Sequence, residues 1–320
     1  MNRVSTMNRM NASVFIGLFV SAGAAWSQPA GQSESSQQFR AGGAVGTTNE
    51  AGEATPMTDN VKVYGSFRFA ESCTFDAGRN LILAMNAGVA QEMQENDGYV
   101  SLVNPDGSVH TTKWIGENRD GLTLNHPLGS AIQGDVLYTG DIDVVRTFDL
   151  ESGEPLDAYQ VPEATILNGI AVTSDGTIYV SNTRPPERIY KITAEGEISV
   201  FVDGAPLMVP NGVAIDPDGN IVVVNIGNND VLTFDPDGEL VRTEQAVEGG
   251  NDGIVILDDG TKYVSSVRFG SVSRIRPGEE AEVIAAGIPS AASMCYDSNQ
   301  NQLVIPMNNH NALAFVTLED

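Results

Sequence analysis

Four side chains with oxygen donors occupy the same position in successive copies of a repeated sequence unit. They are Glu71, Asn168, Asn211 and Asp252. Two carboxylates and two amides, without histidine or cysteine, form a donor set that suits a hard cation. In a roomy ring these oxygens favour calcium over magnesium, although another divalent ion would also fit. The sequence therefore predicts a metal site. The structural alternative is that each residue only begins a turn, as Asn-Gly and Asp-Gly pairs commonly do.

Such a site would have a chemical use. Calcium takes roughly six to eight oxygen ligands, so four side chains leave positions for water or a substrate. An ion with open positions can polarise a lactone or ester carbonyl and stabilise the oxyanion that forms as water adds. A general base should assist the water. Asp252 is the first candidate for this base and Glu71 the second. His126, near the second unit, is expected either at the substrate, as an alternative base, or as a packing histidine.

A repeat of about 40 residues places these side chains. Each copy has a leading residue followed by a small one, then apolar alternation, an acidic turn and a second alternating run. The leading residues of the six copies are Glu71, Leu128, Asn168, Asn211, Asp252 and Ala292. Strands in every copy at a fixed period indicate radial repetition. The sequence therefore predicts an all-β fold, a six-bladed β-propeller with four-stranded blades.

The unit that begins at Asn211 shows how a blade is expected to form. Its apolar runs are four short strands at 213–215, 221–224, 231–234 and 240–242. Asp-Pro-Asp-Gly turns separate strands at 216–219 and 235–238, because proline fixes φ and glycine adopts positive φ. The last unit is one strand short. We expect Val61–Tyr64 to complete it, so that an N-terminal strand closes the ring and covers the open edge.

The leading residues should meet at one mouth of a central channel, since the innermost strands of a propeller all run in the same direction. The second strand of each blade returns to this mouth, and its end should form the rim. These ends are Asn86, Asp141, Asn182, Asn225, Ser265 and Asn308. Asn182 and Asn225 are the two that we expect to contact a substrate. The alternative for each is a turn-forming role at a strand end.

The N-terminal segment is expected to lie outside the propeller. Arg3 and Arg9 precede a short apolar run and small residues, which predicts a secretory signal peptide over 1–27, with an uncleaved anchor as the lesser alternative. Residues 28–60 are rich in Gly, Ser, Thr, Gln and Ala and predict a disordered linker. The propeller then spans 61–320. We expect an exported protein, periplasmic or secreted, without membrane contact after signal cleavage.

The charge of the chain excludes one group of partners. The formal net charge is −25, from 42 acidic and 17 basic residues. Such a surface repels phosphate backbones and acidic lipids, so neither nucleic acid nor an anionic membrane is expected to bind. The expected partner is a small-molecule lactone or ester, and the sequence does not indicate an oligomeric state.

The two cysteines, Cys73 and Cys295, lie in the leading strands of the first and last units. These units are neighbours in a closed ring, and an exported protein could oxidise the pair. When the units are aligned, however, Cys73 matches Met294, so the two cysteine side chains should point to opposite faces. Buried free thiols are therefore favoured over a disulfide.

The blade order of the four oxygen-bearing residues resembles that of a known family. In the calcium-dependent propellers of the gluconolactonase and regucalcin (senescence-marker protein) family, Glu of blade 1, Asn of blades 3 and 4, and Asp of blade 5 are the ligands. Paraoxonase and diisopropyl fluorophosphatase are more distantly similar. The matching residues are Glu71, Asn168 in Leu-Asn-Gly-Ile-Ala, Asn211 in Pro-Asn-Gly-Val-Ala and Asp252 in Asn-Asp-Gly-Ile-Val. Ser72-Cys73 replaces the family's Gly-Pro. The resemblance covers roughly 65–320 and implies a calcium site and hydrolysis of lactones or related esters.

Two functions from different classes follow. The favoured one is a calcium-dependent hydrolase of lactones or related esters. The alternative is a non-catalytic propeller that binds a small ligand or a partner protein around a structural calcium ion. The fold alone does not choose between them.

Overall fold

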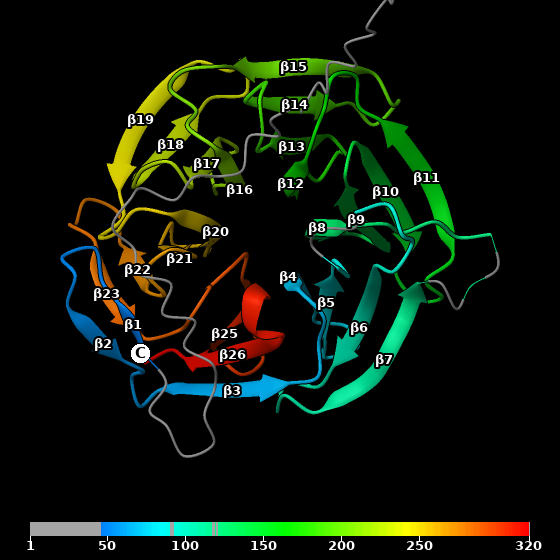
Figure 1. Ribbon diagram of the computed structural model, residues 1–320. Coiled ribbons are helices and arrows are strands. Elements are labelled where there is room, and N and C mark those ends of the chain that lie inside the picture. Colours follow the sequence, from blue (N-terminus) through cyan, green and yellow to red (C-terminus); the bar gives the residue numbers. More distant parts are fainter. Residues whose placement is uncertain (1–45, 90–92, 117–118, 120, 320) are drawn as a thin grey trace, which may run out of the picture. The chain divides into compact units, whose positions relative to one another are not determined.

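Six sheets stand around a central axis in the computed structural model (Figure 1). The structure describes residues 46–89, 93–116, 119 and 121–319. Each of the six sheets has four antiparallel strands. This confirms the predicted six-bladed propeller. The predicted signal peptide lies outside the described residues, and within those residues no helix combines the length and apolar character needed to cross a bilayer.

Blades 1 to 3 each consist of four strands that follow one another along the chain from the axis outward. Blade 1 holds β4 (Ala70–Asp76), β5 (Leu81–Asn86), β6 (Tyr99–Val103) and β7 (Val109–Gly116); blade 2 holds β8 (Pro127–Gln133), β9 (Val136–Asp141), β10 (Val144–Asp149) and β11 (Pro155–Gln160); blade 3 holds β12 (Leu167–Val172), β13 (Ile178–Asn182), β14 (Arg188–Ile192) and β15 (Ile198–Asp203).

Blades 4 and 5 repeat this order, whereas blade 6 takes its outermost strand from the start of the chain. Blade 4 holds β16 (Pro210–Ile215), β17 (Ile221–Asn225), β18 (Asp230–Phe234) and β19 (Leu240–Gln245); blade 5 holds β20 (Asn251–Ile256), β21 (Lys262–Ser266), β22 (Val272–Ile275) and β23 (Glu282–Ala285); blade 6 holds β24 (Cys295–Asp297), β25 (Gln302–Met307), β26 (Ala312–Thr317) and β3 (Val61–Gly65).

The strand β3 closes the ring as predicted. It pairs antiparallel with β26, from Gly65 opposite Ala312 to Val61 opposite Val316. In Figure 1 this blue strand lies along the outer side of the red C-terminal strand. The pairing covers an edge of β26 that would otherwise present unpaired backbone groups.

The acidic turns join strands within a blade. Gly219 adopts φ +85° in the turn after β16, a conformation that suits glycine. One carboxylate oxygen of Asp216 accepts hydrogen bonds from the backbone N–H groups of Asp218 and Asn220, at 3.0 and 2.8 Å. These bonds fix the turn, and they confirm that the Asp-Pro-Asp-Gly motif has a structural use.

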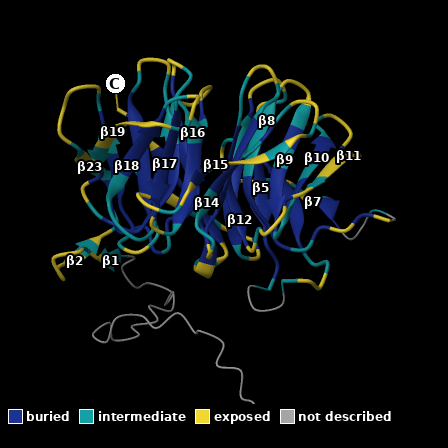
Figure 2. Cartoon of the chain, turned by 90° about the horizontal axis from the view of Figure 1, so that it is seen from above, coloured by how far each residue is buried: buried dark blue, intermediate teal, exposed yellow. Residues whose placement is uncertain are grey.

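The sheets pack face to face, so each blade is covered by a neighbour on both sides. In β17 the side chains alternate: Val222 packs with Ile254 of blade 5, and Val223 packs with Tyr179 of blade 3. All five residues of β17 are buried, whereas the outermost strands β11 and β19 are largely exposed (Figure 2). The strand β17 is therefore apolar from Ile221 to Val224, because both of its faces are covered.

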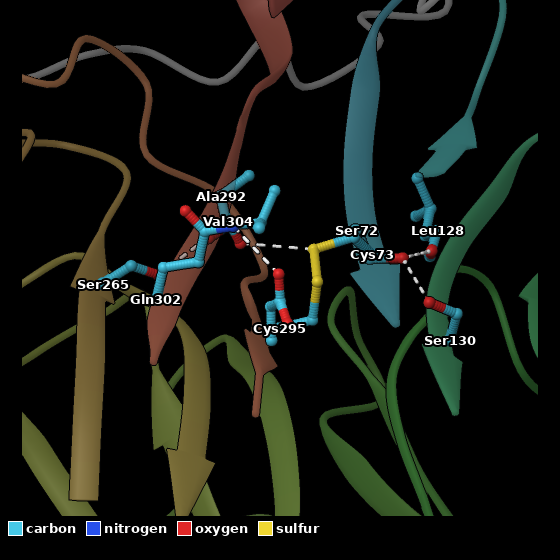
Figure 3. Close-up of a disulfide and its surroundings, with 10 residues drawn as sticks. Ser72, Cys73, Leu128, Ser130, Ser265, Ala292, Cys295, Gln302 and Val304 are labelled. Atoms are coloured by element: carbon cyan, nitrogen blue, oxygen red, sulfur yellow. Dashed lines mark hydrogen bonds between the residues drawn. A yellow bond between two sulfur atoms is a disulfide. The ribbon is translucent and has the colours of Figure 1, made fainter. Parts of the chain in front are cut away.

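The expectation of free thiols is wrong, because Cys73 and Cys295 form a disulfide with Cα atoms 5.4 Å apart (Figure 3). The two residues do stand at alternating positions of their strands. Adjacent blades, however, touch through opposite faces of their sheets. Cys295 faces blade 1 and Cys73 faces blade 6, and both lie in one cluster with Ala84 and Val304. Opposite orientation within the repeat is therefore what allows the two thiols to meet.

The predicted disordered linker also differs from the structure. Its described part contains a hairpin, β1 (Gly46–Thr48) and β2 (Ala54–Pro56). The backbone N–H of Glu50 donates to Glu248 Oε1 at 3.1 Å, and Gly249 N–H donates to Glu50 Oε2 at 3.3 Å. Backbone pairing within the hairpin and polar contacts to the loop between blades 4 and 5 order this segment despite its low content of large apolar residues. The remainder of the linker, residues 28–45, lies outside the described residues.

Candidate metal centre

The four oxygen-bearing residues occupy the second position of their innermost strands. Glu71, Asn168, Asn211 and Asp252 lie in β4, β12, β16 and β20. A register shift follows the first residue of each of these strands, between Leu167 and Ile170 in the case of β12. A bulge of this kind re-aims the side chain at the extra residue. The repeat therefore places the four side chains at the same level along the axis and puts a bulge in the strand at each of them.

Glycines after the leading residues bring neighbouring blades into contact at this level. A Cβ on Gly169 would lie 2.1 Å from the carbonyl oxygen of Asn211. A Cβ on Gly212 would lie 2.6 Å from the carbonyl oxygen of Asp252. The backbone at each leading position thus lies against the glycine of the preceding blade. This close approach places the leading residues of blades 3, 4 and 5 in an unbroken series around the axis.

The four side chains are buried together with unsatisfied oxygen atoms. Their exposed fractions lie between 1% and 5%. Among the described residues, Glu71 Oε2, Asn168 Oδ1 and Asn211 Oδ1 have no hydrogen-bond partner. Asn211 Nδ2 donates to Asp252 Oδ2 at 3.4 Å, which leaves the amide oxygen as the free end. Buried acceptors without donors are costly in a folded protein, and a cation would satisfy all three.

The two carboxylates also interact electrostatically. Burial raises the pKa of Glu71 well above its ordinary value, the negative charge of Asp252 raises it further, and a hydrogen bond from Asn168 lowers it. Burial raises the pKa of Asp252 to about 7, against a hydrogen bond from Ser293 that lowers it. Both pKa values rise because burial removes the ionised carboxylates from water and no cationic side chain among the described residues lies beside them to compensate. A divalent ion between the carboxylates would reverse them.

These observations fit calcium. The set would supply two carboxylate and two amide oxygens, which is a hard and partly charged shell with room for further ligands. In the described part of the chain no three His, Cys, Asp or Glu side chains gather as a metal site. The ligation therefore depends on the two asparagines, whose oxygens are free for it.

His126 lies between blades 1 and 2 and is buried. Its Nδ1 lies 2.7 Å from the carbonyl oxygen of Ala87, and its ring stacks on Phe69 with centroids 6.1 Å apart. Burial lowers its pKa, so the ring is neutral near pH 7. A neutral ring that donates from Nδ1 to a carbonyl keeps its acceptor at Nε2. These contacts favour the packing role that the sequence left open, and substrate contact through Nε2 stays a prediction.

Asn182 and Asn225 end their second strands as predicted, but both side chains are fully buried. Asn182 Oδ1 accepts from the backbone N–H groups of Thr165 and Ile166, at 2.8 and 2.9 Å. Its Nδ2 donates to two further backbone carbonyls. Asn225 Oδ1 accepts from Met208 N–H at 3.1 Å. The structure therefore places these amides inside the loops at the mouth, where they hold the backbone. For Asn182 every hydrogen-bonding group is engaged.

Ser293 is a residue of the site that the sequence reasoning missed. Its hydroxyl donates to Asp252 Oδ1 at 3.3 Å, and its backbone N–H donates to the carbonyl oxygen of Glu71 at 3.1 Å. It follows Ala292, the leading residue of blade 6, which has no oxygen donor. The repeat alignment contains a signal for Ser293, because it places a hydroxyl one position after Ala292, a leading residue without an oxygen donor.

Fold and site together define a class, that of six-bladed propellers with a buried oxygen-donor cluster on the axis. The chain belongs to the SMP-30/gluconolactonase/LRE-like family, whose sequence model matches residues 70–248, more than half of the chain. This confirms the resemblance to the gluconolactonase family, and the matched range includes Glu71, Asn168 and Asn211. No curated protein matches the sequence significantly.

Solved structures show the same fold at low identity. A gluconolactonase from Xanthomonas campestris is 17% identical, with 87% of this chain and 95% of that chain covered and a TM-score of 0.63. A putative gluconolactonase is 14% identical, with 81% and 93% covered and a TM-score of 0.61. The virginiamycin B lyase of Staphylococcus aureus is 12% identical, with 81% and 100% covered and a TM-score of 0.55.

Proposed function

We propose that this protein is a calcium-dependent hydrolase of lactones or related esters. The observation that carries the proposal is the buried set of Glu71, Asn168, Asn211 and Asp252, in which three oxygens have no partner among the described residues. Membership of the family supports the coarser statement, a lactonase-type hydrolase. The metal requirement and the mechanism are what we add to it.

In this proposal the four side chains hold the ion, which supplies polarisation of the substrate carbonyl and stabilisation of the developing oxyanion. Asp252 is the general base, because Asn211 and Ser293 orient its two oxygens separately. One carboxylate oxygen can thus stay fixed while the other accepts a proton from the attacking water. Glu71 is the second candidate for the base. The two asparagines would bind the ion without adding negative charge, so the charges of the two carboxylates balance that of one divalent cation.

A hydrolysis assay with metal control tests the proposal. Purified protein is incubated with sugar lactones, alkyl lactones and aryl esters, first with a chelator and then with calcium added back. Hydrolysis that stops with chelator and returns with calcium supports the proposal. Calcium binding without hydrolysis of any substrate supports the alternative, a ligand-binding or partner-binding propeller with a structural ion. Hydrolysis that persists in chelator contradicts the metal requirement.

We also propose export to the periplasm or the medium, from the pattern of residues 1–27. The Cys73–Cys295 disulfide supports an oxidising compartment. Fractionation of cells that express the full chain, with mass determination of the processed N-terminus, tests this part separately. Full-length protein confined to the cytoplasm would contradict it.

A further inference from the structure

Blade 6 differs from its neighbours at the axis. It carries Ala292 where blades 1, 3, 4 and 5 carry ligand residues, so the two carboxylates, Glu71 of blade 1 and Asp252 of blade 5, flank a blade without a ligand. Its innermost strand β24 has three residues, whereas those of the other five blades have six or seven. The segment before β24 joins β25 through one isolated bridge, Ala291 to Met307. The Ala292 N–H donates to the Pro306 carbonyl oxygen of β25 at 2.8 Å, and regular pairing with β25 resumes only at Cys295.

Contacts to both carboxylate-bearing residues also hold this segment. The Ser293 hydroxyl reaches Asp252, and the Ser293 N–H reaches the backbone of Glu71. Ser72 and Ser293 form a parallel bridge between blades 1 and 6. On the other side, Ser265 Oγ donates to the carbonyl oxygen of Ala292 at 2.8 Å (Figure 3). One short segment thus spans the gap between the two carboxylates.

The disulfide locks this bridge in place. Cys73 lies two residues after Glu71 and Cys295 two residues after Ser293, so the covalent link joins the same two chain segments that the Ser72–Ser293 bridge pairs. Figure 3 shows the link crossing from the strand of Cys73 to that of Cys295, with Val304 beside it. The sulfurs are buried in an apolar cluster and contact neither carboxylate directly. Their effect on the site must pass through the backbone.

We propose that Ser293 and the Cys73–Cys295 disulfide form a clasp that preorganises the ion site by fixing the separation of Glu71 and Asp252. When both carboxylates are ionised they repel each other, and the clasp opposes their movement apart. A site already set at the required spacing loses less free energy on binding. The clasp acts through Glu71 and Asp252 and is a positioning device. It rests on the proposed ion site and goes beyond it, because it assigns calcium affinity to residues that are not ligands.

Calcium titration calorimetry on the oxidised full-length protein tests the role of Ser293. Ser293→Ala should weaken calcium binding about tenfold, as loss of a group that orients a ligand commonly does. Ser293→Thr keeps the hydroxyl and should restore most of the affinity. Ser101→Ala is the matched control, since this buried serine of β6 donates to the Thr112 carbonyl at 2.6 Å, away from the carboxylates. Equal affinity of Ser293→Ala and the wild type would overturn the proposal.

The double variant Cys73→Ala/Cys295→Ala tests the covalent part. It should also weaken calcium binding about tenfold. Val223→Ala, a core substitution between blades 3 and 4, controls for lower stability: it should lower the melting temperature without changing calcium affinity. If the double variant binds calcium as tightly as the wild type, the disulfide has no part in the clasp.

Reduction of the wild type tests the same coupling without substitution. A dithiol cleaves the S–S bond, leaves two protein thiols and closes to its own disulfide, so electrons and protons balance. Coupling between two sites is reciprocal. If reduction of the disulfide weakens calcium binding by some factor, bound calcium should therefore lower the equilibrium constant for reduction of the disulfide by the same factor. The fraction of reduced protein at equilibrium is measured by thiol alkylation, with and without calcium, and decides the matter if the double variant does not fold. An unchanged fraction overturns the proposal.

The failure of the clasp and of the proposed function are distinguishable. If the wild type does not bind calcium, both are overturned. If it binds calcium and hydrolyses lactones, but all the variants bind as tightly, only the clasp is overturned.

Discussion

Neighbouring blades are joined near the axis in two different ways, one in blades 2 to 5 and another at the seam, which is the contact between blades 6 and 1. In blades 2 to 5, glycine lets one backbone pass within van der Waals reach of the next, as Gly169 does at Asn211. At the seam, a closing strand, a serine and a disulfide join the blades. Consecutive repeat units can use the same glycine contact, whereas the first and last blades, which contain the two ends of the chain, are joined by other contacts. The comparison indicates that the repeat fixes three of the four proposed ligands, while the seam fixes the position of Glu71 against them.

The largest effect should come from removing the closing strand. Deletion of residues 61–66 exposes the edge of β26 and removes Val61 from the core, so we expect loss of the cooperative thermal transition in circular dichroism. Deletion of residues 46–56 removes a hairpin that pairs with itself and should lower the melting temperature only modestly. If both deletions had equal effects, β3 would not be the element that closes the ring.

The second largest effect should come from substitution of a glycine near the axis, which disrupts the contacts between blades 2 to 5. Gly169→Ala would place a methyl group 2.1 Å from the Asn211 carbonyl oxygen, and the backbone of blade 4 would have to move. We expect about 3 kcal/mol of destabilisation in urea unfolding, as for overpacking of a rigid site. Gly219→Ala is the control: nothing lies within 4 Å and only its positive φ is strained, at a cost of about 1–2 kcal/mol. Equal losses would show that the blades can separate at the axis.

The sequence predicted the regular region better than the seam, for physical reasons. The residues Glu71, Asn168, Asn211 and Asp252 could be selected because one register repeats, and a repeated register implies a common height around an axis. Side-chain alternation within one sheet does not predict the disulfide, because Cys73 and Cys295 belong to two sheets that face each other. Asn182 looked like a rim residue because strand-end position does not reveal how much of an amide the backbone already uses.

Substitution of Asp252 should change function more than stability. Asp252→Asn keeps shape and burial but removes the charge and the proton acceptor, so calcium binding should weaken by at least about tenfold and lactone hydrolysis should stop. Asp252→Leu should lose the same functions and also destabilise the protein, because Asn211 Nδ2 loses its partner in a buried site. Calorimetry, hydrolysis rates and thermal melts separate the two variants. Full activity in both would show that Asp252 is neither ligand nor base.

The smallest predicted effect is a change in how stability depends on pH. The pKa values of Glu71 and Asp252 are raised in the fold, for Asp252 from 3.8 to about 7, so the folded state holds protons that the unfolded chain has released. Stability of the calcium-free protein is therefore greatest near pH 4 with respect to these groups and is lost as pH rises through about 7.

Excess calcium should remove this loss, because the bound ion keeps both carboxylates ionised. The measurement is the melting temperature between pH 4 and 8, in chelator and in calcium. Surface carboxyls such as Glu282, whose pKa is lowered by Arg274, have the opposite slope but contribute equally to both curves, so the difference between the curves isolates the axial pair. We expect that difference to widen with pH and to shrink in Asp252→Asn. A constant difference would mean that calcium binds where no proton is displaced, away from the axis.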